Sequence, residues 1–145
     1  TCSEISTTMD LTPTLAHLSG MDVPSDRIID GKDIWPLMIG SKGAATPYDA
    51  FFYYKGYDLQ AVRMGKWKLH IKEKQLYNLR DDIGEKSNQF ENNPSVAEKL
   101  QYYTEKCRED LGDGKVKGRN IRKAGRVDNP IFINNREELI QAEYD

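Results

Sequence analysis

Apolar and polar residues alternate from position 59 to position 71, and this pattern predicts two antiparallel strands. A period of two is typical of extended chain with one buried face. The alternation is interrupted at Gly65-Lys66, and glycine at the first of two loop positions favours a type II′ hairpin turn. Residues 50–54 and 75–78 have the composition of two further strands. We therefore predict a small four-stranded antiparallel sheet.

A later stretch carries apolar residues at intervals of 4, 3, 4 and 4, which predicts one continuous stripe on a long helix. The members of the stripe are Val96, Leu100, Tyr103, Cys107 and Leu111. Asn93 is a suitable N-cap, Pro94 suits the first helical position, and Gly112 ends the pattern. A helix with one apolar face beside a four-stranded sheet makes a complete two-layer α+β unit.

The first forty residues predict two short helices. Asp10 is placed to cap a helix that ends before Gly20, and a second helix within 33–40 has Asp33 at its cap. Three leucines share one face of the first helix: Leu11, Leu15 and Leu18. A helix this short is unstable alone in water, so its apolar face requires a surface to pack on.

The chain has 145 residues, of which 38% are hydrophobic and 30% charged, and its net charge of −2 predicts no preferred partner. It opens at Thr1 with neither a signal peptide nor an initiating Met, which favours a segment of something longer. No apolar run approaches the ~20 residues that a membrane span requires. We divide the chain into 1–47 (terminal helices and linker), 48–112 (sheet and long helix) and 113–145 (irregular basic tail).

Residues 113–126 are basic, rich in glycine and without the period of a helix or a strand. We interpret them as an irregular arm that lies on a partner surface. A phosphate-binding patch for nucleic acid is the alternative, but no aromatic residue is interleaved for base stacking, so we expect no nucleic acid. Residues 135–145 have the pattern of a last helix.

Two cysteines and two histidines limit the redox and metal chemistry. Cys107 falls on the apolar face of the long helix, which favours a buried free thiol. A bridge to Cys2 requires a proximity that the sequence leaves open. His17 and His70 lie far apart in the sequence and no paired CxxC is present, so no transition-metal site is predicted.

Four segments, in this order and spacing, carry a family resemblance: Thr8–Leu15, Asp30–Ile34, Ala61–Leu69 and Leu76–Leu79. Together they resemble the C-terminal part of type I sulfatases of the arylsulfatase group. The resemblance implies a parent with an alkaline-phosphatase-like α/β domain, followed by a subdomain of four antiparallel strands and a long helix. Residues 5–40 would then be the last helices of the larger domain.

Type I sulfatases hydrolyse sulfate esters with a formylglycine, made from Cys or Ser in a C/S-x-P/A-x-R motif, and with a Ca²⁺ ion held by Asp and Asn residues. Cys2 is followed by neither the Pro or Ala nor the Arg of that motif, and Asp81-Asp82 stands in the wrong segment for the metal. We therefore expect no catalytic residue, no metal site and no cofactor in this chain. Formylglycine and Ca²⁺ are expected in the intact parent, and the chain alone is expected to be inactive.

Substrate contacts remain possible within the segment. The resemblance implies that His70 lines the substrate pocket, because the corresponding strand end reaches the cleft in some sulfatases; a surface or interface role is the alternative. His70 alternates with Leu69, so it faces away from the apolar side of the sheet. Weaker candidates for sugar or aryl contact lie around the first turn: Tyr54, Lys55 and Tyr57. Arg63 is interpreted as a structural ion-pair partner rather than a sulfate ligand.

Two functional hypotheses follow. The first is a C-terminal sulfatase segment that shapes the substrate entrance and stabilises the N-terminal catalytic domain of the same polypeptide, with a sulfated carbohydrate or aryl substrate. The second is a stand-alone carbohydrate- or polyanion-binding module that uses the aromatic first strand and the basic arm. The resemblance implies a periplasmic, extracellular or lysosomal location.

Overall fold

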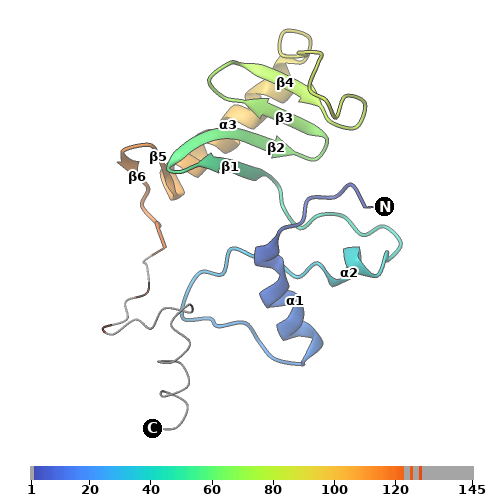
Figure 1. Cartoon of the computed structure of the whole chain (residues 1–145), viewed down its shortest axis with the longest axis vertical. Helices are drawn as coiled ribbons and strands as arrows, with labels where there is room; N and C mark the ends of the chain where they lie inside the picture. The colour runs from blue at the N-terminus through green and yellow to red at the C-terminus, as the bar shows by residue number, and fades with distance from the viewer. Residues whose placement is uncertain (1, 123–124, 126–127, 129–145) are drawn as a thin grey trace, which may run out of the picture.

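The computed structural model describes residues 2–122, 125 and 128, and it is an α+β structure as predicted (Figure 1). One four-stranded sheet carries the long helix α3 on one face, and the short helices α1 and α2 lie away from the sheet near the N-terminus. The elements are η1 (Thr8–Asp10), α1 (Leu11–Leu18), α2 (Trp35–Met38), β1 (Phe51–Lys55), β2 (Asp58–Met64), β3 (Trp67–His70), β4 (Gln75–Asn78), α3 (Pro94–Asp110), β5 (Gly112–Asp113) and β6 (Val116–Lys117).

The sheet is an antiparallel meander with the order β1-β2-β3-β4, so each strand pairs with its neighbour in sequence. The predicted hairpin turn is present, because Met64 pairs with Trp67 around Gly65 and Lys66. Gly65 has a φ of 53° and Lys66 keeps a negative φ, as a type II′ turn requires and a type I′ turn does not. The β1–β2 turn also has a left-handed glycine, Gly56.

The core lies between the sheet and α3. Val62, Leu69 and Leu76 from three adjacent strands pack against Ala97 and Leu100 of the helix, and each of the five is almost fully buried. Register explains this cluster, since Val62 pairs with Leu69 and Leu69 with Leu76. One row of cross-strand neighbours therefore supplies the fully buried centre of the sheet side, and the neighbouring pair Met64 and Trp67 packs beside it.

The predicted apolar stripe of α3 faces the core but is incomplete. The buried side of the helix includes Ala97 and Thr104, whereas Val96 and Tyr103 flank the core and are only half-buried. A search for apolar residues alone does not find Thr104. Its hydroxyl donates to the Leu100 carbonyl at 2.9 Å, so its hydrogen-bonding need is met within the helix.

Asp10 occupies the expected N-cap position of α1, but the expected side-chain cap bond is absent. Asp10 makes no side-chain cap bond to α1; instead Thr7 caps the preceding turn η1 in a reciprocal capping box with Asp10. The Asp10 carboxylate is fully buried and accepts from the Thr7 amide at 2.7 Å, the Lys32 amide at 2.8 Å and the Tyr48 hydroxyl. Burial, together with the Asp10 charge, raises the pKa of Tyr48 to about 12.

Close backbone contact reinforces this arrangement. A Cβ atom at Gly31 would lie 2.0 Å from the Met9 carbonyl oxygen, so only glycine fits between η1 and the loop. The Ile34 amide donates to the Thr14 hydroxyl at 3.0 Å, which ties the start of α2 to α1. The parts of the N-terminal segment, η1, α1, the following loop and α2, are thus held together mainly by hydrogen bonds.

The apolar face of α1 is not covered by the described residues. Leu11, Leu15 and Leu18 are 47%, 61% and 48% exposed, and Met21 beyond the helix is 69% exposed. Among residues 2–47, only Ile5 and Ile34 belong to the buried hydrophobic set. The stripe predicted to require a packing surface lacks one within the described part of the chain.

The tail differs from the expected irregular arm. Residues 112–113 and 116–117 pair as the short ribbon β5–β6, which follows α3 directly. Beyond the ribbon, Arg122 forms an ion pair with Asp30, so this part of the tail lies on the chain itself. The predicted helix at 135–145 lies outside the described residues. Cys2 is exposed and Cys107 buried, and both are free thiols.

No helix among the described residues is long and apolar enough to cross a bilayer.

We expect Leu100→Ala to lower the free energy of unfolding by about 2–5 kcal/mol, because it leaves a cavity in a fully buried position. Leu15→Ala is the matched control, since the same deletion at a 61% exposed site should cost less than about 0.5 kcal/mol in this chain. Urea unfolding of both variants measures the difference. Equal losses would contradict the burial of Leu100 or the exposure of Leu15.

Candidate functional site

The face of the sheet opposite α3 carries half of the aromatic side chains of the strands and several of the polar ones. Because side chains alternate along a strand, the residues between those of the core all lie on this outer face. They form two cross-strand rows, Phe51–Arg63–Lys68–Tyr77 and Tyr53–Ala61–His70–Gln75. The outer face therefore brings three basic side chains and three aromatic rings together.

A glutamate from the loop after β4 lies at the centre of this face. Glu85 accepts from the Lys68 ammonium at 2.7 Å and contacts Nε2 of His70 at 2.6 Å, and all three side chains are half-buried. The Lys68 ammonium also lies 5.1 Å from the ring centre of Tyr53, and His70 meets Tyr77 edge to face at 5.8 Å. We call Glu85, Lys68 and His70 the Glu85 cluster.

The Glu85 cluster fixes both charge and proton position. Burial acts to raise the pKa of Glu85, but hydrogen bonds from Lys68 and His70 outweigh it, so the pKa lies below its ordinary value. With Nε2–H donating to Glu85, a neutral His70 keeps Nδ1 as an acceptor, and a protonated His70 offers two donors. Glu85 also holds a left-handed backbone, with a φ of 53°, a conformation that costs energy for a residue with a side chain.

The four substrate-contact candidates do not lie together. His70 is on the outer face, as its alternation with Leu69 predicted. Tyr54 is on the α3 side, where its hydroxyl donates to the Gly112 carbonyl at 2.7 Å and lies 3.2 Å from Sγ of Cys107. Burial raises the pKa of Tyr54. Lys55 and Tyr57 come together at the exposed β1–β2 turn, where Tyr57 is 85% exposed.

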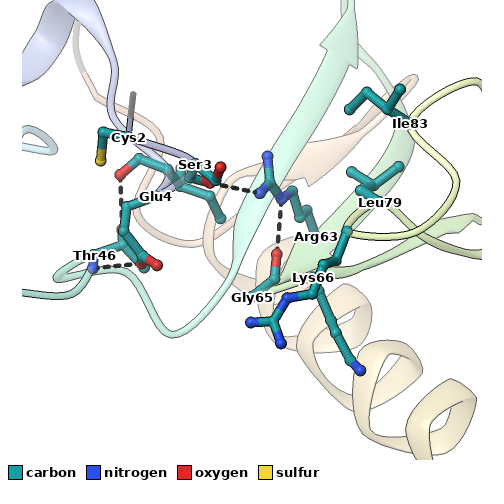
Figure 2. A pocket seen from close by; sticks show the side chains of 11 residues that line it. Cys2, Ser3, Glu4, Thr46, Arg63, Gly65, Lys66, Leu79 and Ile83 are labelled. Carbon is teal, nitrogen blue, oxygen red and sulfur yellow. Dashed lines mark hydrogen bonds between the residues drawn. The ribbon is translucent and has the colours of Figure 1, made fainter.

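The ion pair expected of Arg63 is wrong within the described residues. Its guanidinium instead donates from Nε to the Gly65 carbonyl at 2.8 Å and from Nη2 to the Ser3 carbonyl at 3.1 Å. Figure 2 shows this side chain at the centre of an open pocket of about 500 Å³, which Lys66 and Arg80 also line. Sequence reasoning missed the pocket because Ser3 and Arg63 are 60 positions apart.

The described residues do not fit the cofactors of the resembled family. No group of three His, Cys, Asp or Glu side chains among them could hold a metal ion. Asp82 accepts from the Lys86 and Ser87 amides, each at 2.8 Å, and Asp81 accepts from the Asn78 side chain at 2.7 Å, so both carboxylates serve a turn. The basic side chains that this face presents are Arg63, Lys68 and His70, and Glu85 contacts the last two.

The chain is similar in sequence to known proteins over part of its length. No family model matches the chain. An arylsulfatase of Hemicentrotus pulcherrimus is 42% identical over 82 residues, which cover 57% of this chain and 14% of that protein. The N-acetylgalactosamine-6-sulfatase of Canis lupus familiaris is 42% identical over 68 residues, which cover 47% of this chain and 12% of that protein. The chain thus spans 14% or less of the length of these relatives.

Two solved structures superpose on this chain. The crystal structure of Ps i-CgsB superposes with a TM-score of 0.57 at 27% identity, over 72% of this chain and 24% of that one. A Bacteroides thetaiotaomicron protein of glycosaminoglycan metabolism superposes with a TM-score of 0.54 at 22% identity, over 68% of this chain and 24% of that one, which is a likeness in fold. In sequence, the chain is similar to curated sulfatases over about half of its length. Its sheet, long helix and short helices correspond to their C-terminal region, as the four sequence segments predicted.

We expect Glu85→Gln to lower the free energy of unfolding at neutral pH by about 1–2 kcal/mol, because two charge-assisted contacts are weakened. Since the folded-state pKa of Glu85 is depressed, this stability is fully present above the unfolded value near 4.5 and is lost as the pH falls through the lower folded value. Urea unfolding at a series of pH values measures the gap between wild type and variant, which should close in acid.

Glu91→Gln is the control, because Glu91 is exposed and its charge should matter little at any pH. A gap for Glu85→Gln that stays constant into acid would contradict the ionic role of Glu85.

Proposed function

We propose that the chain acts as the C-terminal part of a sulfatase, a hydrolase of sulfate esters. In this role α1 and its neighbouring segment dock on the catalytic domain of the same polypeptide, and the outer face of the sheet lines the substrate entrance. The observation that carries the proposal is the uncovered apolar face of α1 in a chain similar in sequence to much longer sulfatases.

The physical reason is the cost of leaving that face in water. Three leucines on an eight-residue helix are each about half exposed or more, and Met21 extends the patch. Burying a fully exposed leucine is worth roughly 1.5–3 kcal/mol, so covering the exposed half of each of these side chains would contribute about half of that per residue. A stand-alone binding module has no use for this face, which disfavours the second hypothesis.

Within this function, the division into 1–47, 48–112 and 113–145 assigns the docking role to the first part and substrate contact to the second. His70 contacts the anionic substrate from the outer face, and Glu85 positions its ring. Lys55 and Tyr57, at the exposed turn, provide further contacts with sugar or aryl groups. Tyr54 has no substrate contact in this proposal, because its hydroxyl donates to the Gly112 carbonyl on the helix side.

The catalytic step belongs to the other domain in this proposal. A formylglycine and a Ca²⁺ ion there would supply the nucleophile and the charge stabilisation, and this chain would bind and orient the substrate. The substrate class is a sulfated carbohydrate or aryl ester, since the relatives are named as arylsulfatase and N-acetylgalactosamine-6-sulfatase. A periplasmic, extracellular or lysosomal location fits such a substrate.

We expect the chain alone to show no turnover of a chromogenic aryl sulfate in the presence of Ca²⁺, because neither the nucleophile motif nor a metal site is present in its described residues. Absorbance of the released phenol measures the reaction, with an active sulfatase as the positive control. Turnover above the uncatalysed rate would refute the proposed division of labour.

In an intact sulfatase that carries this chain, we expect His70→Ala to reduce kcat/KM by about tenfold or more, because a hydrogen bond to a charged substrate group is lost. Lys72→Ala is the control, since Lys72 is exposed in the β3–β4 loop two residues away. Steady-state kinetics on one sulfated substrate compares the two variants. Unchanged kinetics for His70→Ala would remove His70 from the site.

A further inference from the structure

The basic pocket is formed where the start of the chain meets the sheet. Its wall comes from residues 2–5, the linker at Thr46, the β2–β3 turn and the loop after β4, and its volume is about 500 Å³. Figure 2 shows the Arg63 side chain pointing to the Ser3 backbone, to whose carbonyl it donates at 3.1 Å. The pocket thus lies between residues 2–5 of the N-terminal segment and the outer face of the sheet.

Three cations line this pocket: Arg63, Lys66 and Arg80. None of them forms an ion pair with a carboxylate of the described residues. The single acid in the wall, Glu4, accepts from the Thr46 amide at 2.8 Å. The pocket therefore concentrates positive charge on a chain whose net charge is −2, and a concave positive surface attracts anions.

Arg63 is held in place before any ligand arrives. Its two hydrogen bonds to the Gly65 and Ser3 carbonyls use two of the five N–H groups of a guanidinium and leave three for a ligand. Because both partners are backbone atoms, they hold the side chain without neutralising its charge. Less side-chain entropy is then lost when an anion binds.

Part of the pocket wall is apolar. Leu79 and Ile83 form one side of it, and Ile83 is 81% exposed. A bare inorganic anion would leave these side chains without a partner, whereas the ring of a sugar or an aryl group would cover them. The lining fits a ring that bears a negative group.

We propose that this pocket is a second anion subsite, which binds a sulfate or carboxylate group on the ring next to the one contacted by His70. The inference rests on the proposed function. Register supports the placement, since the Arg63–Lys68 pair lies two residues along the strands from the Ala61–His70 pair. That separation is roughly 7 Å, so one extended anionic chain can reach both positions.

Binding to the 145-residue chain tests the subsite. Isothermal titration with a sulfated N-acetylgalactosamine–glucuronate tetrasaccharide should show binding that Lys66→Gln combined with Arg80→Gln weakens by about tenfold or more. Lys72→Gln combined with Lys106→Gln removes the same charge elsewhere and should leave the affinity within about twofold. Melting curves check that both double variants remain folded, which is expected because Arg80, Lys72 and Lys106 are exposed and Lys66 is partly exposed.

The desulfated tetrasaccharide and inorganic sulfate distinguish the anchoring group. Loss of binding without sulfate assigns the subsite to sulfate, and retained binding assigns it to the carboxylate; both support an anion subsite. Equal weakening by the two double variants, or no binding to wild type, overturns it. Binding is measured without the catalytic domain, so its failure is separate from that of the His70 kinetics, which test the proposed function.

Discussion

The buried carboxylate of Asp10 is the constraint on which the N-terminal segment depends. Burying a charge is costly unless hydrogen bonds compensate, and here the Thr7 amide, the Lys32 amide and the Tyr48 hydroxyl all donate to it. These donors come from three separate parts of the first 48 residues. The segment therefore keeps its shape through one polar centre and leaves the leucines of α1 exposed, as the proposed docking role requires.

The sheet and α3 are held together in the opposite way to the N-terminal segment. Apolar side chains form the contacts between them, and most polar side chains face outward. Charge on the outer face is organised at two points, around Glu85 and around Arg63. The position of Arg63 depends on both the N-terminal segment and the sheet, since its guanidinium, on a β2 residue, donates to the Ser3 carbonyl. The geometry of the basic pocket thus reports how the two halves are oriented.

Periodicity predicted the strands, the apolar face of α1 and the outward direction of His70. Turn and cap residues predicted the rest, since Gly65 indicated the β2–β3 turn and Asn93, Pro94 and Gly112 indicated the extent of α3. Each of these depends on residues close in sequence. The roles of Asp10, Glu85 and Arg63 were missed because their partners lie 22, 15 and 60 positions away. The β5–β6 ribbon was missed because two-residue strands carry no detectable period, and Thr104 because a polar letter interrupts an apolar stripe.

The nearest-neighbour order of the sheet has a consequence for how the chain acquires its structure. Every strand pair closes a loop of only a few residues, so little entropy is lost before the first contacts form. Domains dominated by such short-range contacts reach their transition state quickly. The N-terminal segment, by contrast, is completed by a contact across 38 positions between Asp10 and Tyr48, so it is the part expected to settle last.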